Sequence, residues 1–388
     1  MKKLIKSLHL KEVGVLEMTF ALAPMLSGFN LGPLPLSLLM WVLLIGFAMI
    51  KAGRFKLEDF KPLTIFVIYW FLHTLVIMAV DTVNLNGVTA QLIYFASVYF
   101  VSPALNIDKL RGSLNWVMLI SIAGLLYQWG IIANGGLVHP LEIPGLSMPE
   151  TRMSTLMLRP SSFYMEPAAY VAFAICPLFW ALTERQWIWS VIIILSMFLT
   201  TSTTGIVLSF IMLGMTLFAN KLKFRNIVLV IILGAGLYYG LTHLEMFSAG
   251  VDKIENTDTE TNTRLNQGRR IVSTMNPGEY VIGAPYSTPY NYCKDRGVTN
   301  IDVDGDTVFM STFWLLILCY GVVGLILYLY VYWRIVKFNR RTIPLVVCLM
   351  AIMFSSGYAL GVSYIFTLIV LLVFPRLKDD RDRNNSYV

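Results

Sequence analysis

At residues 159–170 the chain reads Arg159-Pro160-Ser161-Ser162-Phe163-Tyr164-Met165-Glu166-Pro167-Ala168-Ala169-Tyr170. In this stretch a polar loop runs into an apolar helix. Pro167 suits the first turn of that helix, where the missing N–H of proline is no loss. Glu166 is then expected at the positive end of the helix dipole, close to a membrane surface. Because charged residues beside a bilayer are usually functional, Arg159 and Glu166 are the first candidate site residues.

The composition around this stretch indicates a membrane protein. Of the 388 residues, 56% are hydrophobic and only 14% are charged. A soluble protein could not bury that much apolar surface, so we expect an all-α polytopic membrane protein, with residues 1–388 in one integral membrane domain. The four cysteines have neither disulfide nor metal-site spacing, so no metal and no cofactor is expected.

Twelve apolar stretches are predicted to span the membrane, although several are shorter than the roughly 20 residues that a bilayer needs. They cover about residues 13–31, 33–50, 63–80, 87–103, 114–133, 167–183, 187–201, 204–220, 226–244, 309–333, 343–356 and 358–374. With both termini in the cytoplasm, only eight of the 30 Lys and Arg residues lie outside, and none lies within a span. The eight are Arg152, Arg159, Lys253, Arg264, Arg269, Arg270, Lys294 and Arg296. The positive-inside rule favours this orientation, so the net charge of +7 reflects topology and no nucleic-acid partner is expected.

Two outer loops are larger than the others. Residues 134–166 are rich in Gly and Pro, and residues 245–308 are far longer than a connector needs to be. Loops of that length are usually functional or disordered. The second loop contains a predicted helix at 263–275, which Asn276-Pro277-Gly278 ends.

Two roles are open for each charged residue of the opening stretch. Arg159 presents a planar fork of donors that suits a diphosphate, or it is an interfacial arginine that reaches for lipid headgroups. Glu166 is a general base or an orienting partner for Arg159, or it only stabilises a helix N-terminus.

Hydroxyl groups form a second candidate feature, in the turn Thr200-Thr201-Ser202-Thr203-Thr204-Gly205. Ser202 and Thr203, together with Tyr164, are candidates for contacts to a sugar or phosphate. The alternative is that these hydroxyls satisfy backbone groups that are freed where helices end near the membrane.

The long outer loop supplies the remaining candidates. Arg264, Arg269 and Arg270 are its densest cation cluster, but at about 100° per residue all three cannot face one diphosphate. Asp306 is the best placed of the acids around Gly305 to reach the membrane surface, and their spacing is not that of a Ca²⁺ loop. The chain has no Gly-rich nucleotide loop and no Ser/His/Asp set. A substrate at the outer face must therefore arrive already activated, as a lipid-linked diphosphate does.

The combination resembles the O-antigen and exopolysaccharide polymerases of Wzy type, within the O-antigen polymerase/ligase superfamily. The Arg159–Tyr170 stretch is similar to that family's Arg, aromatic, Glu-Pro signature, and residues 199–205 are similar to its hydroxyl-rich turn. Thr263-Arg264, Val281-Ile282-Gly283 and Tyr320-Gly-Val-Val-Gly324 resemble further family stretches. Many relatives have an arginine where this chain has Thr203. Ligases tend to have a histidine where it has Asp306, so the resemblance favours a polymerase.

The resemblance implies an inverting, metal-independent glycosyltransferase of the bacterial inner membrane, acting at the periplasmic face. Its donor and acceptor would be glycans linked to undecaprenyl diphosphate, and a chain-length regulator is left open as a further partner. Arg159, Arg264 and Arg270 would bind the diphosphate, and Glu166 or Asp306 would accept the hydroxyl proton. The alternatives are an O-antigen ligase, with lipid A–core as acceptor, and a flippase for lipid-linked oligosaccharides.

Overall fold

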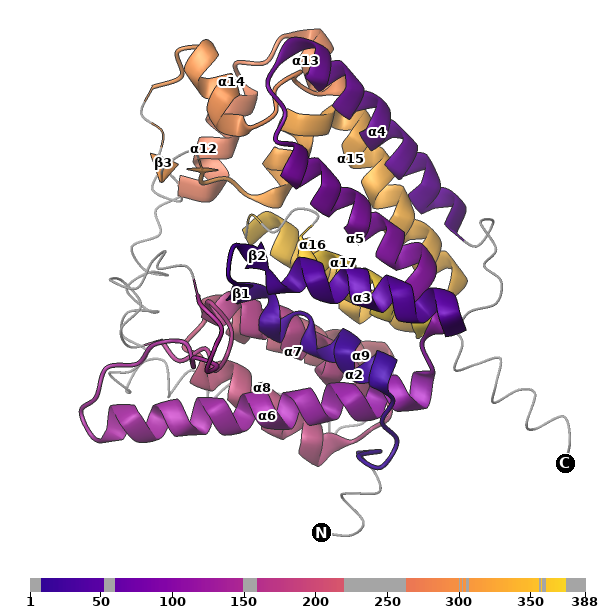
Figure 1. Ribbon diagram of the computed structural model, residues 1–388, viewed down its shortest axis with the longest axis vertical. Helices are drawn as coiled ribbons and strands as arrows, with labels where there is room; N and C mark the ends of the chain where they lie inside the picture. The colour runs from indigo at the N-terminus through magenta and orange to yellow at the C-terminus, as the bar shows by residue number, and fades with distance from the viewer. Residues whose placement is uncertain are drawn as a thin grey trace, which may run out of the picture.

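The computed structural model describes residues 8–51, 60–148, 159–219, 263–299, 301, 303–304, 307–355, 357 and 361–374, and these fold into a bundle of helices (Figure 1). The α-helices are α2 (Val15–Leu22), α3 (Leu36–Lys51), α4 (Lys61–Val80), α5 (Leu85–Ala104), α6 (Ile107–Ala133), α7 (Pro167–Thr183), α8 (Trp187–Leu199), α9 (Thr203–Ala219), α12 (Thr263–Val272), α13 (Pro277–Ile282), α14 (Pro289–Asp295), α15 (Thr312–Phe338), α16 (Ile343–Ser355) and α17 (Val362–Val373). The short 3-10 helices are η1 (Met25–Gly28) and η5 (Arg340–Thr342). Two antiparallel pairs of strands complete the described elements: β1 (Asn30–Leu31) with β2 (Leu34–Pro35), and β3 (Val303–Asp304) with β4 (Thr307–Val308).

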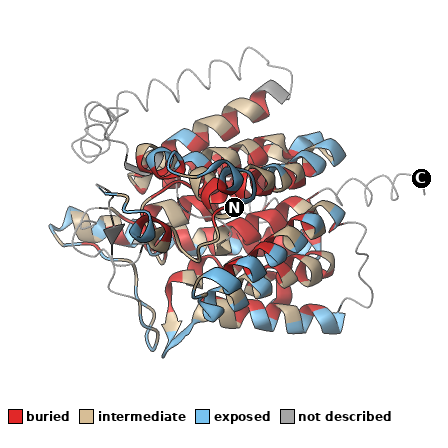
Figure 2. Cartoon of the chain, turned by 90° about the horizontal axis from the view of Figure 1, so that it is seen from above, coloured by how far each residue is buried: buried red, intermediate tan, exposed pale blue. Residues whose placement is uncertain are grey.

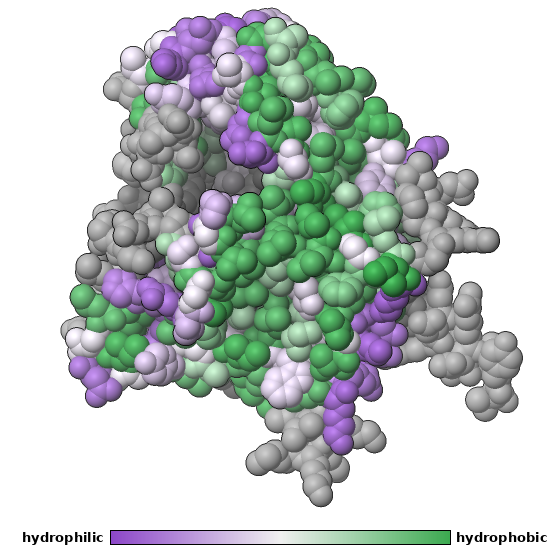
Figure 3. All heavy atoms as spheres, in the orientation of Figure 1, coloured by the Kyte–Doolittle hydropathy of each residue, from purple (hydrophilic) through white to green (hydrophobic). Residues whose placement is uncertain are grey.

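Four of the described helices, α4, α5, α6 and α15, are long and apolar enough to cross a membrane. Large apolar side chains are exposed along α3, α4 and α5, and these helices present a broad hydrophobic face (Figure 3). Polar residues lie towards the two ends of this face rather than across it (Figure 3). Such a surface is suited to lipid rather than to water. The predicted span at 226–244 lies outside the described residues.

The first predicted span differs from the structure. Instead of one helix over residues 13–31, α2 ends at Leu22 and is followed by η1 and the β1–β2 hairpin. Pro24 explains the early end, because it has no N–H to continue the hydrogen bonds of the helix, although Ala23 before it still has helical angles. Gly32 then supplies the positive φ of 59° that the tight β1–β2 turn requires.

The core surrounds α7 and α17, most of whose residues are buried. Buried residues gather in the interior of the bundle, and exposed ones lie towards its outside (Figure 2). Helix α7 packs against α6, α8, α9, α16 and α17. Aromatic rings link the elements at this centre, since Phe366 of α17 lies 4.7 Å from Phe20 of α2 and 5.7 Å from Phe173 of α7, measured between ring centroids. Helix α7 therefore gives the 159–166 segment a rigid support.

Polar contacts join distant parts of the chain at each of the two ends of the bundle. At one end, buried Glu17 accepts hydrogen bonds from Lys51 (3.0 Å) and from the N–H of Asn106 (2.8 Å). At the other end, Asn30 pairs with Ser147, and the side chain of Gln128 donates to the carbonyl of His139 (2.6 Å). The loop after α6, the β1–β2 hairpin and α12–α14 all lie at this second end (Figure 1).

Helix α15 is broken at Gly321, where the chain after α13 packs against it. Gly321 has φ of 65°, and a Cβ there would lie 2.3 Å from the carbonyl oxygen of Val281. Gly283 has φ of 97°, and a Cβ there would lie 2.5 Å from the carbonyl oxygen of Cys319. Both positions therefore require glycine. The two glycine stretches noted in the sequence are thus direct neighbours.

Asp81, which follows α4, accepts hydrogen bonds from residues around the start of α14. Its carboxylate accepts hydrogen bonds from the N–H of Ser287 (2.9 Å), the hydroxyl of Ser287 (2.8 Å) and the side chain of Asn291 (3.1 Å). The Ser287 N–H is the main reason that the pKa of Asp81 is lowered to about 2. This carboxylate holds the α13–α14 segment (residues 277–295) against the end of α4.

We expect Asp81→Asn to lower the unfolding temperature at neutral pH, because the negative acceptor is lost. A carboxyl with a lowered pKa stabilises the folded chain above the pH at which the unfolded carboxyl titrates, about 4, and the contribution is lost as the pH falls to about 2. Thermal unfolding in detergent between pH 7 and pH 3 should show wild type and variant converging at low pH. A difference that does not change with pH would contradict this role.

Candidate functional site

Glu166 is the N-cap of α7, and Pro167 is the first residue of the helix, as predicted. The N-cap backbone is extended, with φ −150° and ψ 156°, and its carbonyl accepts the N–H groups of Ala169 (3.0 Å) and Tyr170 (3.3 Å). Within the described residues the carboxylate makes no capping bond to α7. The start of this buried helix therefore carries a carboxylate that does not cap the helix.

Arg159 lies close enough to Glu166 for the two charges to interact. The arginine is half-buried, and this burial lowers the pKa of its guanidinium, whereas the negative charge of Glu166 raises it. Because an arginine stays protonated in proteins, the guanidinium remains a cation here. A fixed cation thus lies within electrostatic range of a carboxylate at the N-terminus of α7.

Gln128 of α6 holds the backbone between these two charges. Its side-chain oxygen accepts the N–H groups of Ser161 (3.0 Å) and Ser162 (2.7 Å), and its side-chain nitrogen donates to His139. Ser162 has a left-handed φ of 58°, and its buried hydroxyl has no hydrogen-bond partner within the described residues. Gly124 makes room for this turn, since a Cβ there would lie 2.4 Å from the Ser162 hydroxyl. Sequence reasoning missed Gln128, for which the only signal was an amide within an apolar span.

Gln128→Leu should destabilise the protein, because the N–H groups of Ser161 and Ser162 would be buried without an acceptor. Each such group costs about 1–3 kcal/mol, so the free energy of unfolding should fall by about 2–6 kcal/mol for the two groups. Gln128→Glu, which burial favours in its protonated form, keeps an acceptor for both N–H groups and a donor for the His139 carbonyl, so it should lose less stability than Gln128→Leu. Thermal unfolding of both variants checks this, and equal stability of Gln128→Leu and wild type would contradict it.

Tyr164 belongs to the packed core rather than to an open surface. Its side chain is 1% exposed, its hydroxyl lies 3.2 Å from that of Ser121, and its ring packs against Tyr170 and Phe173. This position favours a structural role over contact with a sugar.

The hydroxyl-rich turn lies beside the start of α7. Trp129, next to Gln128 on α6, donates to the carbonyl of Leu199 (2.9 Å), and Gly205 lies against Val171 of α7. Thr200 donates to the carbonyl of Met197, and buried Ser202 accepts the N–H of Gly205, whereas Thr203 begins α9 and is half-buried. The bonds of Thr200 and Ser202 are local, as the alternative interpretation of this turn predicts.

The cations of the long outer loop are not joined to the 159–166 segment in the described structure. Arg270 is exposed at the end of α12 and donates to the carbonyl of Thr299 (3.1 Å). Arg269 is also exposed. Arg264 lies in the first turn of α12, but its side chain is outside the described structure, as is the whole of Asp306.

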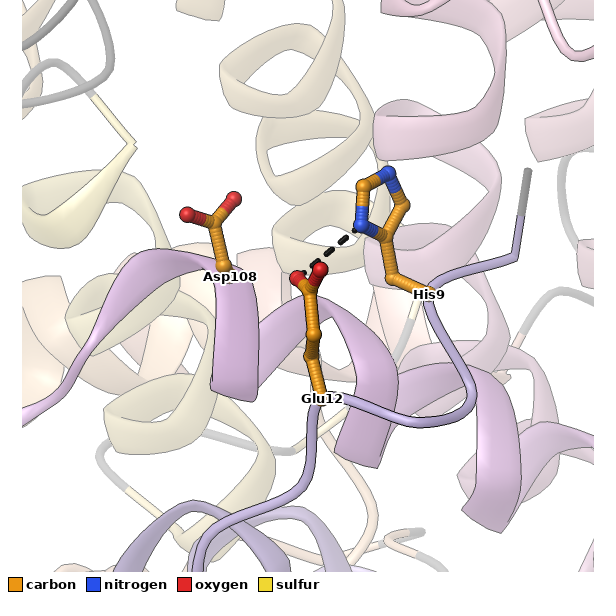
Figure 4. A group of neighbouring side chains, drawn as sticks. All are labelled: His9, Glu12 and Asp108. Carbon is orange, nitrogen blue, oxygen red and sulfur yellow. Dashed lines mark hydrogen bonds and ion pairs between the residues drawn. The ribbon is translucent and has the colours of Figure 1, made fainter. Parts of the chain in front are cut away.

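A second charged cluster, which sequence reasoning missed, lies at the opposite end of the bundle. Arg111 of α6 is 5% exposed and donates to Glu184, to Asp108 (2.9 Å) and to the Nδ1 of His9 (2.7 Å). Figure 4 shows His9 bonded to Glu12, with Asp108 beside them, a grouping that could hold a metal ion. The Arg111 guanidinium already supplies the positive charge of this group, so we interpret it as an ionic lock and not as a metal centre.

No protein-family model matches the chain, and no curated protein matches it with significant similarity.

Proposed function

We propose that the protein is an O-antigen or exopolysaccharide polymerase, a glycosyltransferase that joins repeat units carried on undecaprenyl diphosphate. It would lie in the bacterial inner membrane with about twelve spans, both termini in the cytoplasm and its site at the periplasmic face. The positive-inside distribution of Lys and Arg supports this orientation. The resemblance of residues 159–170 to the polymerase signature supports the activity.

The observation that carries the proposal is the Arg159–Glu166 pair at the N-terminus of buried α7. Helix N-termini and arginine forks both favour phosphate oxygens. As the glycosidic phosphate bond breaks, negative charge develops on the departing diphosphate. A fixed cation that stabilises this charge is worth several kcal/mol. Gln128 would contribute by holding the backbone between the two charged residues in place.

In the proposed reaction, a hydroxyl of the acceptor sugar attacks the anomeric carbon of the donor. The bond from that carbon to the phosphate oxygen breaks with inversion, and undecaprenyl diphosphate leaves with the bonding electron pair. Glu166 or Asp306 accepts the hydroxyl proton, and Arg159, aided by Arg264 or Arg270, binds the leaving diphosphate. Confinement of both lipid-linked reactants to the membrane would add proximity.

The glycan ladder of a strain that lacks the protein tests the proposal. Loss of a polymerase should leave single repeat units on the lipid A–core, and the gene for the wild-type chain should restore the ladder. Bare core with long glycan still on undecaprenyl diphosphate would indicate a ligase. Bare core with repeat units held in the cytoplasm would indicate a flippase, and an unchanged ladder would reject all three.

A further inference from the structure

The end of α13 lies against the middle of α4 rather than beyond its end. The hydroxyl of Tyr69 is 2.7 Å from the carbonyl oxygen of Ile282 and 2.8 Å from that of Tyr320. His73 lies beside the backbone of Gly283. The N–H of Ala284 donates to the carbonyl of Leu318 in α15 (2.8 Å).

These contacts show how far along α4 residues 282–284 lie. Helix α4 is apolar up to Val80, and His73 and Tyr69 come seven and eleven residues before Val80. At about 1.5 Å of rise per residue, they lie roughly 10–17 Å from that end of the helix. Helical side chains tilt towards the N-terminus, so the contacts of Tyr69 and His73 lie no nearer the Val80 end than their Cα atoms. Both α4 and α15 are long and apolar enough to span a membrane. Residues 282–284 therefore lie at the level of membrane-spanning helices.

Backbone N–H and carbonyl groups of the non-helical chain at this level have hydrogen-bond partners. Gly283 donates its N–H to Glu279, and the carbonyls that α15 leaves open around Gly321 are approached by Tyr69 and Ala284. Irregular backbone at membrane depth is tolerated only where protein satisfies it in this way. The glycine pair Gly283 and Gly321 allows the close approach.

The outward face of α13 is apolar. Tyr280 is 44% exposed, Val281 49% and Ile282 55%. Helix α4 also exposes apolar side chains, among them Met78, which is 49% exposed, and Val80, which is 62% exposed. Because α13 ends at the level of the middle of apolar α4, acyl chains are the environment that matches this exposed apolar face.

We propose that residues 280–284 form a re-entrant membrane element. It enters the bilayer from the end of α4 that carries Asp81, places Tyr280, Val281 and Ile282 against lipid acyl chains, and turns back at Gly283. Asp81 anchors the returning chain at Ser287. The inference does not depend on the proposed activity.

Cysteine accessibility in proteoliposomes tests this element. Val281→Cys and Ile282→Cys are made in the full-length chain with the half-exposed Cys319 replaced by alanine, and Lys294→Cys at an exposed position of α14 is the water-facing control. Each variant is treated with a quaternary-ammonium methanethiosulfonate. Separately, each introduced cysteine is labelled with a nitroxide in detergent before reconstitution, and collisions of the nitroxide with O2 and with a water-soluble nickel chelate are compared, because a thiol in hydrocarbon is not ionised and reacts too slowly with a lipid-soluble maleimide. Native Cys293 is 1% exposed, so its labelling reports unfolding of the outer segment.

We expect the cysteine at 281 or 282 to react with the charged reagent at least about tenfold more slowly than the cysteine at 294, because a fixed charge partitions poorly into hydrocarbon. The nitroxide at 281 or 282 should collide with O2 more than with the chelate, and the nitroxide at 294 should show the reverse. Equal rates with the charged reagent, while Cys293 stays unlabelled, would overturn the inference. A nitroxide that neither O2 nor the chelate reaches would also overturn it, because protein and not lipid would then cover the face. If Cys293 becomes labelled in one variant, the variant at the other position decides.

Discussion

Replacing Arg159 by alanine is expected to reduce chain extension by about 10²–10³-fold, the usual effect of removing one preorganised group that stabilises transition-state charge. Single-repeat glycan should remain in place of long chains. Arg159→Lys should also be impaired, because a point charge does not replace a planar fork of donors. Glu166→Ala should give the same phenotype if the carboxylate orients Arg159 or accepts the proton. The glycan ladder and membrane-inserted protein are measured together.

The control for Arg159 is another outer cation that lies away from the segment. Lys294→Ala removes a charge from exposed α14 and should leave the ladder unchanged. Long glycan from Arg159→Ala at normal levels of inserted protein would remove the residue from the site. Loss of long glycan from both variants would mean that general outer charge, and not the Arg159–Glu166 pair, matters. Arg264→Ala then asks whether a second guanidinium acts with Arg159, and a normal ladder would exclude that residue.

Arg111→Ala is expected to have the largest effect on stability. The guanidinium is buried and pairs with Glu184, which is 15% exposed, and it also holds Asp108 and His9. Its removal leaves a largely buried carboxylate without its cation, and breaking such a pair costs about 3–5 kcal/mol. Lys109→Ala, two residues away at an exposed position, should change the free energy of unfolding by less than about 0.5 kcal/mol.

A double variant separates the effect of the Arg111–Glu184 ion pair from the effect of the size of the arginine side chain. Arg111→Met with Glu184→Gln removes both charges and should recover part of the stability lost in Arg111→Met alone. Thermal unfolding in detergent compares the double variant with Arg111→Met alone and Glu184→Gln alone. If the double variant is as unstable as the sum of the single ones, the two side chains do not act as a pair.

Local rules of the backbone predicted the start of α7 correctly. Pro167 at the first helical position and Glu166 at the N-cap follow from the missing N–H of proline, which needs no knowledge of the rest of the chain. The helix predicted at 263–275 corresponds to α12, but α12 ends at Val272, and Asn276-Pro277-Gly278, predicted to end that helix, instead caps and begins α13. The first span was predicted too long, because overall hydrophobicity was weighed above the interruption at Pro24.

Contacts between distant segments could not be predicted. Gln128 binds backbone that follows it by more than thirty residues, and nothing local shows that an amide in an apolar helix has such partners. Arg111 precedes the span predicted at 114–133 and so was expected in a cytoplasmic loop. Helix α6 instead begins at Ile107 and buries Arg111 against Glu184. The contact between Gly283 and Gly321 likewise depends on how α13 meets α15.

The most direct test of the proposed activity is reconstitution. The purified chain is placed in proteoliposomes with undecaprenyl-diphosphate-linked repeat units from a strain that lacks it, and products are separated by length. We predict multiples of the repeat on undecaprenyl diphosphate and release of free undecaprenyl diphosphate, with neither formed by Arg159→Ala. Single repeats that persist with the folded wild-type chain, at substrate levels that a known polymerase extends, would contradict the account.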